Sequence, residues 1–193
     1  MKRSSSRDLA LVATFAAVVA ALGVLPGVYP LGIPVPVTAQ SLGVMLAGAV
    51  IGARRGFLAV ALLLVLVALG LPLLAGGRGG LGVFASPSVG FLLGWPVAAY
   101  VVGWLTERHG APYRVAWGVV ANVAGGIVVL YALGTLGMMW RLRLGVGPAL
   151  ALNGWYVVGD AAKVVVAAVV ARGVHAAYPG LLGGRRERQS ATA

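Results

Sequence analysis

Residues 9–53 decide the fold class: they read LALVATFAAVVAALGVLPGVYPLGIPVPVTAQSLGVMLAGAVIGA and contain no charged residue. A helix crosses the hydrocarbon core of a bilayer with about 20 apolar residues. The stretch is therefore long enough for two crossings. Proline and glycine, which interrupt helices, are concentrated in residues 26–36. This pattern predicts one membrane helix over residues 9–25 and a second over residues 38–53.

The remainder of the chain has the same character. Of its 193 residues, 60% are hydrophobic and 10% are charged, whereas a typical soluble domain has about a quarter charged. This composition excludes a soluble globule and a disordered chain. Further helices are expected over residues 56–74, 89–106, 115–138 and 149–171. We therefore predict an all-α integral membrane protein, with a basic N-terminus (residues 1–8), one six-helix membrane domain (residues 9–171) and a basic, flexible tail (residues 172–193).

The basic residues predict how the bundle is oriented. The net charge of +11 results from 15 Lys and Arg against 4 Asp and Glu. With six spans and both termini in the cytoplasm, only Arg78, Arg141 and Arg143 lie outside, and Lys163 lies within a span. This distribution obeys the positive-inside rule. The charge excess is thus explained by the lipid bilayer, and we expect no nucleic-acid partner.

Asp160 and Lys163 lie in the middle of the last predicted span. An ionisable group there costs about 2.5–3.5 kcal/mol on insertion scales and normally has a partner or a function. Their i, i+3 spacing allows them to pair, and Asn153 and Tyr156 fall on the same face, within an arc of about 80°. Three interpretations are open: a structural ion pair, a binding site for a small polar ligand, or a proton relay. A relay chain with only one membrane-embedded carboxylate would be unusually short.

A glycine-rich segment, Gly76–Gly80, surrounds Arg78 in a predicted outer loop. Glycine permits positive φ and close approach to a ligand. Exposed N–H groups beside an arginine can form an anion-binding concavity. We therefore take Gly77, Arg78 and Gly79 as candidate ligand-binding residues, the alternative being a flexible, solvated turn. Gln40, at the outer start of the second helix, either binds the ligand or caps the helix.

Several activities are not expected. Cysteine is absent, and neither histidine has a second ligand at useful spacing, so we predict no metal site. No Walker lysine, carboxylate pair or Ser–His arrangement is present, so an enzyme is not expected. A different feature is the four-residue spacing of Ala13, Ala17 and Ala21, which permits close helix approach. It indicates either internal packing or a docking face for another membrane subunit.

The order of the motifs is similar to that of a known family. Residues 34–48, PVPVTAQSLGVMLAG, resemble the signature of the BioY family, the biotin-specific substrate-capture subunits of energy-coupling-factor (ECF) transporters. Residues 52–56 (GARRG), 70–72 (GLP) and 76–80 follow in the family's order. Residues 159–163, GDAAK, match its Gly-Asp-x-x-Lys motif. The resemblance covers about residues 8–171.

The resemblance implies a multi-pass protein of the bacterial cytoplasmic membrane with an outward-facing biotin pocket and no cofactor. It implies that a transmembrane coupling subunit and two cytoplasmic ATPases supply the energy, with Ala13, Ala17 and Ala21 as the docking face. Asp160 and Lys163 suit the ureido ring of biotin, and Arg78 or the glycine loop suits its carboxylate. Phe91 replaces a tyrosine of the family pattern, and Val158 replaces a proline. A self-sufficient carrier for biotin or a related vitamin, an intramembrane enzyme and a purely structural subunit are the rival hypotheses.

Overall fold

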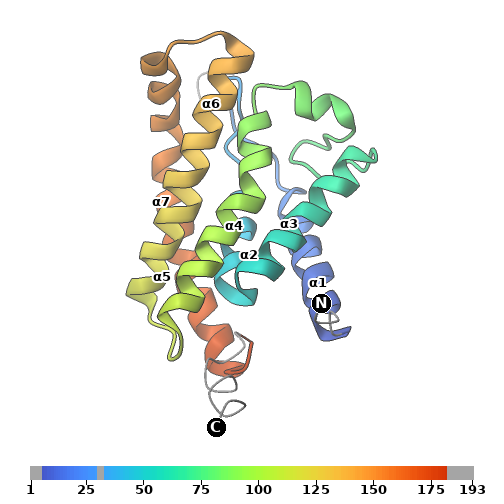
Figure 1. Cartoon of the computed structure of the whole chain (residues 1–193). Helices are drawn as coiled ribbons and strands as arrows, with labels where there is room; N and C mark the ends of the chain where they lie inside the picture. The colour runs from blue at the N-terminus through green and yellow to red at the C-terminus, as the bar shows by residue number, and fades with distance from the viewer. Residues whose placement is uncertain (1–5, 30–32, 182–193) are drawn as a thin grey trace.

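The computed structural model describes residues 6–29 and 33–181, and these form a bundle of helices (Figure 1). Within these ranges, β-type pairing is limited to two isolated bridges. The prediction of an all-α chain is therefore confirmed. The helices are α1 (Ser6–Leu22), α2 (Gln40–Ile51), α3 (Ala53–Ala68), the short 3₁₀ helix η2 (Leu81–Ala85), α4 (Val89–His109), α5 (Val115–Asn122), the π-helical segment η3 (Val123–Val129), α6 (Leu130–Leu142) and α7 (Val146–Ala177).

The predicted helices are found close to their expected positions, with differences at their ends. The predicted helix over residues 56–74 is too long: α3 ends at Ala68, because Gly70 adopts φ 105° and Pro72 follows it. Residues 69–80 form a loop instead. In contrast, α7 continues past the predicted boundary at residue 171 to Ala177. The rest of the predicted tail falls mostly on residues 182–193, which lie outside the described residues.

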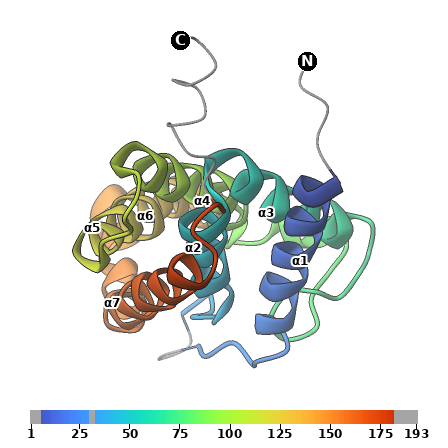
Figure 2. The same cartoon turned by 90° about the horizontal axis from the view of Figure 1, so that it is seen from below.

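Helix α2 lies at the centre of the bundle, as Figure 2 shows. It contacts α1, α3, α4 and α7, and nearly all its residues are buried. A helix that is apolar on every side is expected to be enclosed in this way. Gly48 permits a close approach of α2 to α4, because a Cβ there would overlap the Ala99 carbonyl and Val102 of α4. The centre of the fold is therefore the short second helix.

The segment η3 joins α5 and α6 into one continuous helix, Val115–Leu142. Its wider turns contain Gly125 and Gly126. A Cβ on Gly125 would overlap the Ala98 carbonyl oxygen of α4, and one on Gly126 would overlap Met45 of α2. The glycine pair thus allows the π-helical turns to pack tightly on two neighbouring helices.

The outer surface of the bundle is apolar as well. Large hydrophobic side chains are exposed along α4 and α7, including Leu93, Tyr100, Val165 and Val169. By length and composition, α4 and the continuous helix Val115–Leu142 could each cross a membrane, and α2 is a shorter apolar helix. An apolar exterior over an apolar core agrees with the membrane class expected from the composition.

The chain crosses the bundle back and forth, so α1 begins and α7 ends at the same end (Figure 1). We call this the terminal end. The α2–α3 and α4–α5 turns also lie there, and Arg55 bonds to Asp8 (2.8 Å) and to the Leu181 carbonyl (2.8 Å). The opposite end, which we call the loop end, holds the α1–α2 connection, residues 69–88 and the α6–α7 turn.

Candidate functional site

A cavity opens in the half of the bundle nearer the loop end. It encloses about 520 Å³ of space when the open solvent at its mouth is included. Residues 35–38 of the α1–α2 connection cover one side. The other walls come from α2, α4, α6, α7 and the residue 69–88 connection, and the lining comprises Val35, Pro36, Val37, Thr38, Gln40, Ser41, Arg78, Ser88, Phe91, Leu92, Trp95, Leu130, Tyr156, Asp160 and Lys163.

Asp160 and Lys163 form an ion pair in the wall of this cavity. The Nζ atom of Lys163 lies 2.7 Å from Oδ1 of Asp160, the distance of a charge-assisted hydrogen bond. Both belong to α7, where the i, i+3 spacing places them on the inward face. Asp160 is only 5% exposed. The predicted pairing is therefore present, and the pair faces a cavity as well as each other.

The start of α2 completes a small polar network around the pair. Lys163 Nζ also donates to the Thr38 carbonyl (2.8 Å) and to Ser41 Oγ (3.0 Å). Ser41 Oγ lies 3.2 Å from Asp160 Oδ1 and 3.3 Å from the Thr38 carbonyl. The three donors of the ammonium group thus all have partners. Our sequence reasoning missed Ser41 and Thr38, although both stand in the quoted stretch 34–48.

Tyr131 of α6 is the other missed residue. Its hydroxyl donates to Oδ2 of Asp160 at 2.9 Å. With the bonds from Lys163 and Ser41, this gives the carboxylate three donors, out of about four that its lone pairs can accept. The sequence signal that could have identified Tyr131 is a tyrosine within an apolar helix, since a buried phenol normally has a hydrogen-bond partner.

Aromatic rings form the apolar wall beside the polar network. Phe91 and Tyr156 meet edge to face with centroids 5.7 Å apart, and Tyr131 contacts both rings in similar geometry. The Tyr156 hydroxyl donates to the Val35 carbonyl at 3.1 Å, so it anchors the α1–α2 connection to α7. Trp95 also lines the cavity. Flat, apolar groups of a ligand would pack on this wall.

Arg78 reaches the cavity, whereas its glycine neighbours do not line it. A turn closed by paired backbone bonds between Leu74 and Arg78 holds it (3.0 and 3.1 Å), and its Nε donates to the Ala75 carbonyl (3.2 Å). Gly77 has φ 68°, which favours glycine. Gly79 is needed for space, because a Cβ would overlap the Leu71 carbonyl. The two glycines therefore shape the turn that presents Arg78.

Gln40 lines the cavity, but its side-chain amide forms hydrogen bonds with backbone groups. Its Nε2 donates to the Val19 carbonyl (3.2 Å) and the Leu73 carbonyl (3.0 Å), and its Oε1 accepts from Ala75 N–H (3.0 Å). It is 1% exposed. The side chain thus ties α1, α2 and the Arg78 turn together and does not cap the helix. Its binding of a ligand stays a prediction.

Asn153 lies one turn from Tyr156 on α7 but is not among the residues lining the cavity. Its Nδ2 donates to Thr135 Oγ1 of α6 at 2.6 Å. Asn153 Oδ1 is buried and has no hydrogen-bond partner in the described part of the chain. The predicted polar stripe on α7 therefore divides: Tyr156, Asp160 and Lys163 face the cavity, and Asn153 links two helices.

Ala13, Ala17 and Ala21 lie together on the exposed side of α1, while Ala16 and Val19 face inward. The small-residue stripe is thus not used for packing within the described bundle. Of the two interpretations offered for it, internal packing does not match this placement. The stripe is available to another helix in the membrane.

Taken together, the cavity suits a ligand with three chemically different parts. Asp160 and Lys163 can bind a head with both N–H donors and a carbonyl acceptor. The aromatic wall can hold an apolar middle, and Arg78 can pair with an anionic end. The two charges of the buried pair cancel, so the head itself is expected to be uncharged.

Comparisons with known proteins agree with this picture. The BioY family model matches residues 1–180. A biotin transporter BioY of Rhizobium etli is 51% identical, covering 91% of this chain and 96% of the relative, and one of Rhodobacter capsulatus is 48% identical, covering 91% and 97%. The crystal structure of the S-component for biotin from an ECF-type ABC transporter superposes with a TM-score of 0.82 at 26% identity, covering 91% of this chain and 94% of that one. The chain is therefore a membrane protein that belongs to the BioY family.

Proposed function

We propose that this chain captures biotin in the cavity and acts as the substrate-binding subunit of an ECF-type transporter. The observation that carries the proposal is the Asp160–Lys163 pair, which forms the polar part of a cavity that is otherwise largely apolar. The names of the relatives and the fold match support the same ligand. A purely structural subunit would need no such cavity.

The ureido ring of biotin complements the pair, since it has two N–H donors and one carbonyl acceptor. Asp160 already accepts from Lys163, Ser41 and Tyr131, which leaves about one acceptor position. All three Lys163 donors are in use as well. Binding is therefore an exchange: Lys163 turns one N–H from the protein to the ligand carbonyl while Asp160 takes a ligand N–H.

Arg78 is proposed to pair with the carboxylate of biotin. Its bond to the Ala75 carbonyl uses one of its five N–H donors, so the rest of the guanidinium can meet a carboxylate in a bidentate arrangement. Gly77 and Gly79 contribute by forming the turn, and Gln40 by holding that turn against α1 and α2. Asn153 contributes indirectly, by joining α7 to α6 beside Tyr156.

We further propose six membrane spans with both termini in the bacterial cytoplasm. The common end at which α1 begins and α7 ends supports an even number of crossings, and the basic residues at the terminal end agree with the positive-inside rule. In this arrangement residues 1–8 and 172–193 are the cytoplasmic N-terminus and tail, and residues 9–171 are the membrane domain. The cavity then faces outward.

The proposed partners are a transmembrane coupling subunit and two cytoplasmic ATPases. The exposed Ala13–Ala17–Ala21 stripe of α1 is the proposed contact with the coupling subunit, since small residues let helix backbones approach closely. The chain has no Walker lysine, so the energy for uphill uptake must come from partners or from ion coupling. A self-sufficient carrier is the second candidate, and biotin uptake in cells lacking coupling subunits separates the two.

The decisive experiment is a ligand comparison by isothermal titration calorimetry on the purified protein. We expect saturable binding of biotin and none of thiamine or riboflavin at the same concentrations. An analogue whose ureido oxygen is replaced by an imino group should bind at least tenfold more weakly, because it no longer offers an acceptor to Lys163. The absence of biotin binding by folded protein would refute the proposal.

A further inference from the structure

In the part of the chain that the structure describes, the charged residues of the loop-end connections all have the same sign. The connections at this end, residues 23–39, 69–88 and 143–145, contain Arg78 and Arg143, and Arg141 stands in the last turn of α6. None of these segments contains Asp or Glu. The acidic side chains Asp8 and Glu107 lie at the terminal end, where they bond to Arg55 and to Ala53 N–H.

Asp160 does not offset this positive charge, because Lys163 neutralises it at 2.7 Å. The mouth of the cavity therefore faces a net positive field from Arg78, Arg141 and Arg143, which we call the cationic rim. The positive-inside rule, which explains the basic residues at the terminal end, predicts the opposite at this end. The topology of the chain thus gives no reason for the rim.

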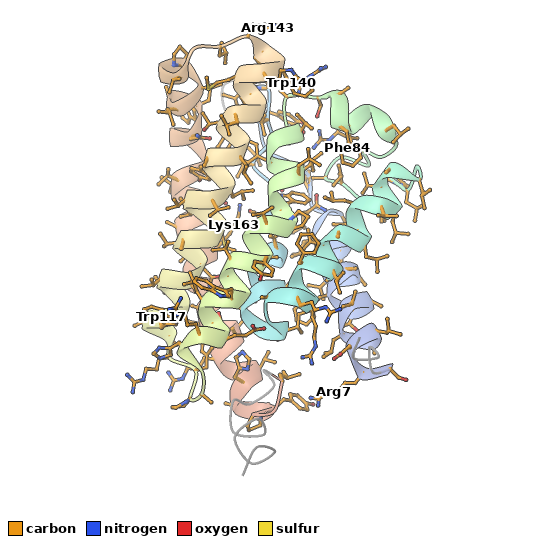
Figure 3. All side chains as sticks on the ribbon, viewed as in Figure 1. Arg7, Phe84, Trp117, Trp140, Arg143 and Lys163 are labelled. Carbon is orange, nitrogen blue, oxygen red and sulfur yellow. The ribbon has the colours of Figure 1, made fainter. Side chains whose placement is uncertain are left out.

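Two members of the rim stand away from the cavity. Arg141 lies eleven residues beyond the cavity-lining Leu130 on α6, which corresponds to about 16 Å along the helix axis. Arg141 is exposed and its guanidinium lies 5.3 Å from the centroid of the Trp140 ring. Arg143 is exposed where α6 ends, at the top of Figure 3, well above Lys163. Neither residue lines the cavity, so any effect of their charges on the ligand is a long-range electrostatic one and needs no contact.

We propose that Arg141 and Arg143, together with Arg78, steer an anionic ligand toward the cavity, an inference that rests on the proposed capture of biotin, a monoanion at neutral pH. Fields of one sign at the mouth of a low-dielectric cleft raise the association rate of a ligand of opposite sign by about 10- to 1,000-fold in favourable cases. Arg78 then also holds the carboxylate, while Arg141 and Arg143 affect arrival alone.

Association kinetics test this division of roles. Trp95 in the cavity wall makes tryptophan fluorescence a suitable signal for stopped-flow mixing. The probes are biotin and its uncharged primary amide. Rates are compared at ionic strengths of about 10 mM and about 1 M, where the Debye length falls from about 30 Å to about 3 Å. The variant is Arg141→Gln/Arg143→Gln, and Arg114→Gln/Arg172→Gln removes two exposed charges at the terminal end as the matched control.

At low ionic strength we expect the Arg141→Gln/Arg143→Gln variant to bind biotin about threefold to tenfold more slowly than the unaltered protein, with the same dissociation rate. The corresponding double glutamate variant should be slower still. High salt should abolish these differences, and the amide should show none. The control variant should keep the unaltered rates, and each single glutamine variant should show about half the effect, on a logarithmic scale.

Equal association rates in the unaltered protein and the Arg141→Gln/Arg143→Gln variant at low salt would overturn the inference. An equal slowing of biotin and its amide would also overturn it, because the two arginines would then act through the shape of the cavity mouth and not through their charge. Failure of the proposed function looks different: the unaltered protein would give no biotin response at any salt concentration, either by fluorescence or by calorimetry.

Discussion

Replacement of Lys163 by methionine, alone and together with Asp160→Asn, separates the contribution of the ion pair to protein stability from its contribution to biotin binding. Methionine keeps the length and apolar stem of lysine but removes the ammonium group, and with it the bonds to Asp160, Ser41 and the Thr38 carbonyl. Asp160 is then a buried charge with no cationic partner. In the double variant no charge remains at this position of α7.

The structure gives the size of the effect. Removing one member of a buried ion pair costs about 3–5 kcal/mol. We expect about 3 kcal/mol for Lys163→Met, the lower end of that range, because Ser41 and Tyr131 still donate to the carboxylate. The double variant should recover about 2 kcal/mol of this loss, since no unpaired charge is buried. Equilibrium unfolding in mixed detergent micelles measures both values.

Biotin affinity should follow a different pattern. Each lost charge-assisted hydrogen bond removes about 1.5–3 kcal/mol of binding free energy, or about 10- to 150-fold in Kd. The double variant should bind at least tenfold more weakly than the unaltered protein although its stability has recovered. Arg55→Gln, which loses an ion pair at the terminal end, is the control and should bind normally. If the double variant regains biotin affinity together with stability, the pair is structural and our reasoning is wrong.

Three further changes test other parts of the structure. Tyr131→Phe should weaken biotin binding about tenfold in calorimetry, because the hydroxyl no longer holds Asp160 Oδ2; Tyr100→Phe on the exposed side of α4 is the control, and equal affinities in both variants would contradict the role of Tyr131. Ala17→Leu should abolish co-purification with the coupling subunit and leave biotin affinity unchanged; intact assembly argues against docking through α1. Burial raises the pKa of Tyr113 to about 12, whereas the phenol of the unfolded chain titrates near 10. Ionisation of the unfolded state should therefore lower the stability of the protein as pH rises from about 10 to about 12, and Tyr113→Phe should remove this part of the loss; an unchanged alkaline profile would refute it.

The positions of the helices could be predicted because each helix is an apolar run whose end is marked by charge, glycine or proline. Residues 89–106 and 115–138 correspond to α4 and to the continuous helix Val115–Leu142. The end of α3 was mispredicted because residues 69–74 are mostly apolar, and hydropathy outweighed Gly70 and Pro72 in the prediction. The π-helical turns of η3 could not be foreseen, since they depend on the packing of Gly125 and Gly126 against α4 and α2.

Only the part of the site that lies on a single helix could be predicted from the sequence. The spacing of Tyr156, Asp160 and Lys163 is sufficient by itself to place them on one face of α7. Ser41 and Tyr131 reach the same carboxylate from α2 and α6. Their participation depends on the rotation of three helices relative to one another, and the periodicity of a single helix does not determine that rotation.

Gln40 and Asn153 show a related limit, which concerns what a buried amide bonds to. Backbone groups inside a membrane need internal partners wherever the chain is not helical. The loop that follows α3 brings the Leu73 carbonyl and the Ala75 N–H into the bundle, and Gln40 bonds to both. Asn153, in contrast, donates to the Thr135 hydroxyl of α6. Helix α6 is a regular α-helix, whose backbone groups bond within the helix. The partner of a buried amide therefore depends on where the neighbouring backbone departs from helix, and the mispredicted end of α3 concealed the backbone partners of Gln40.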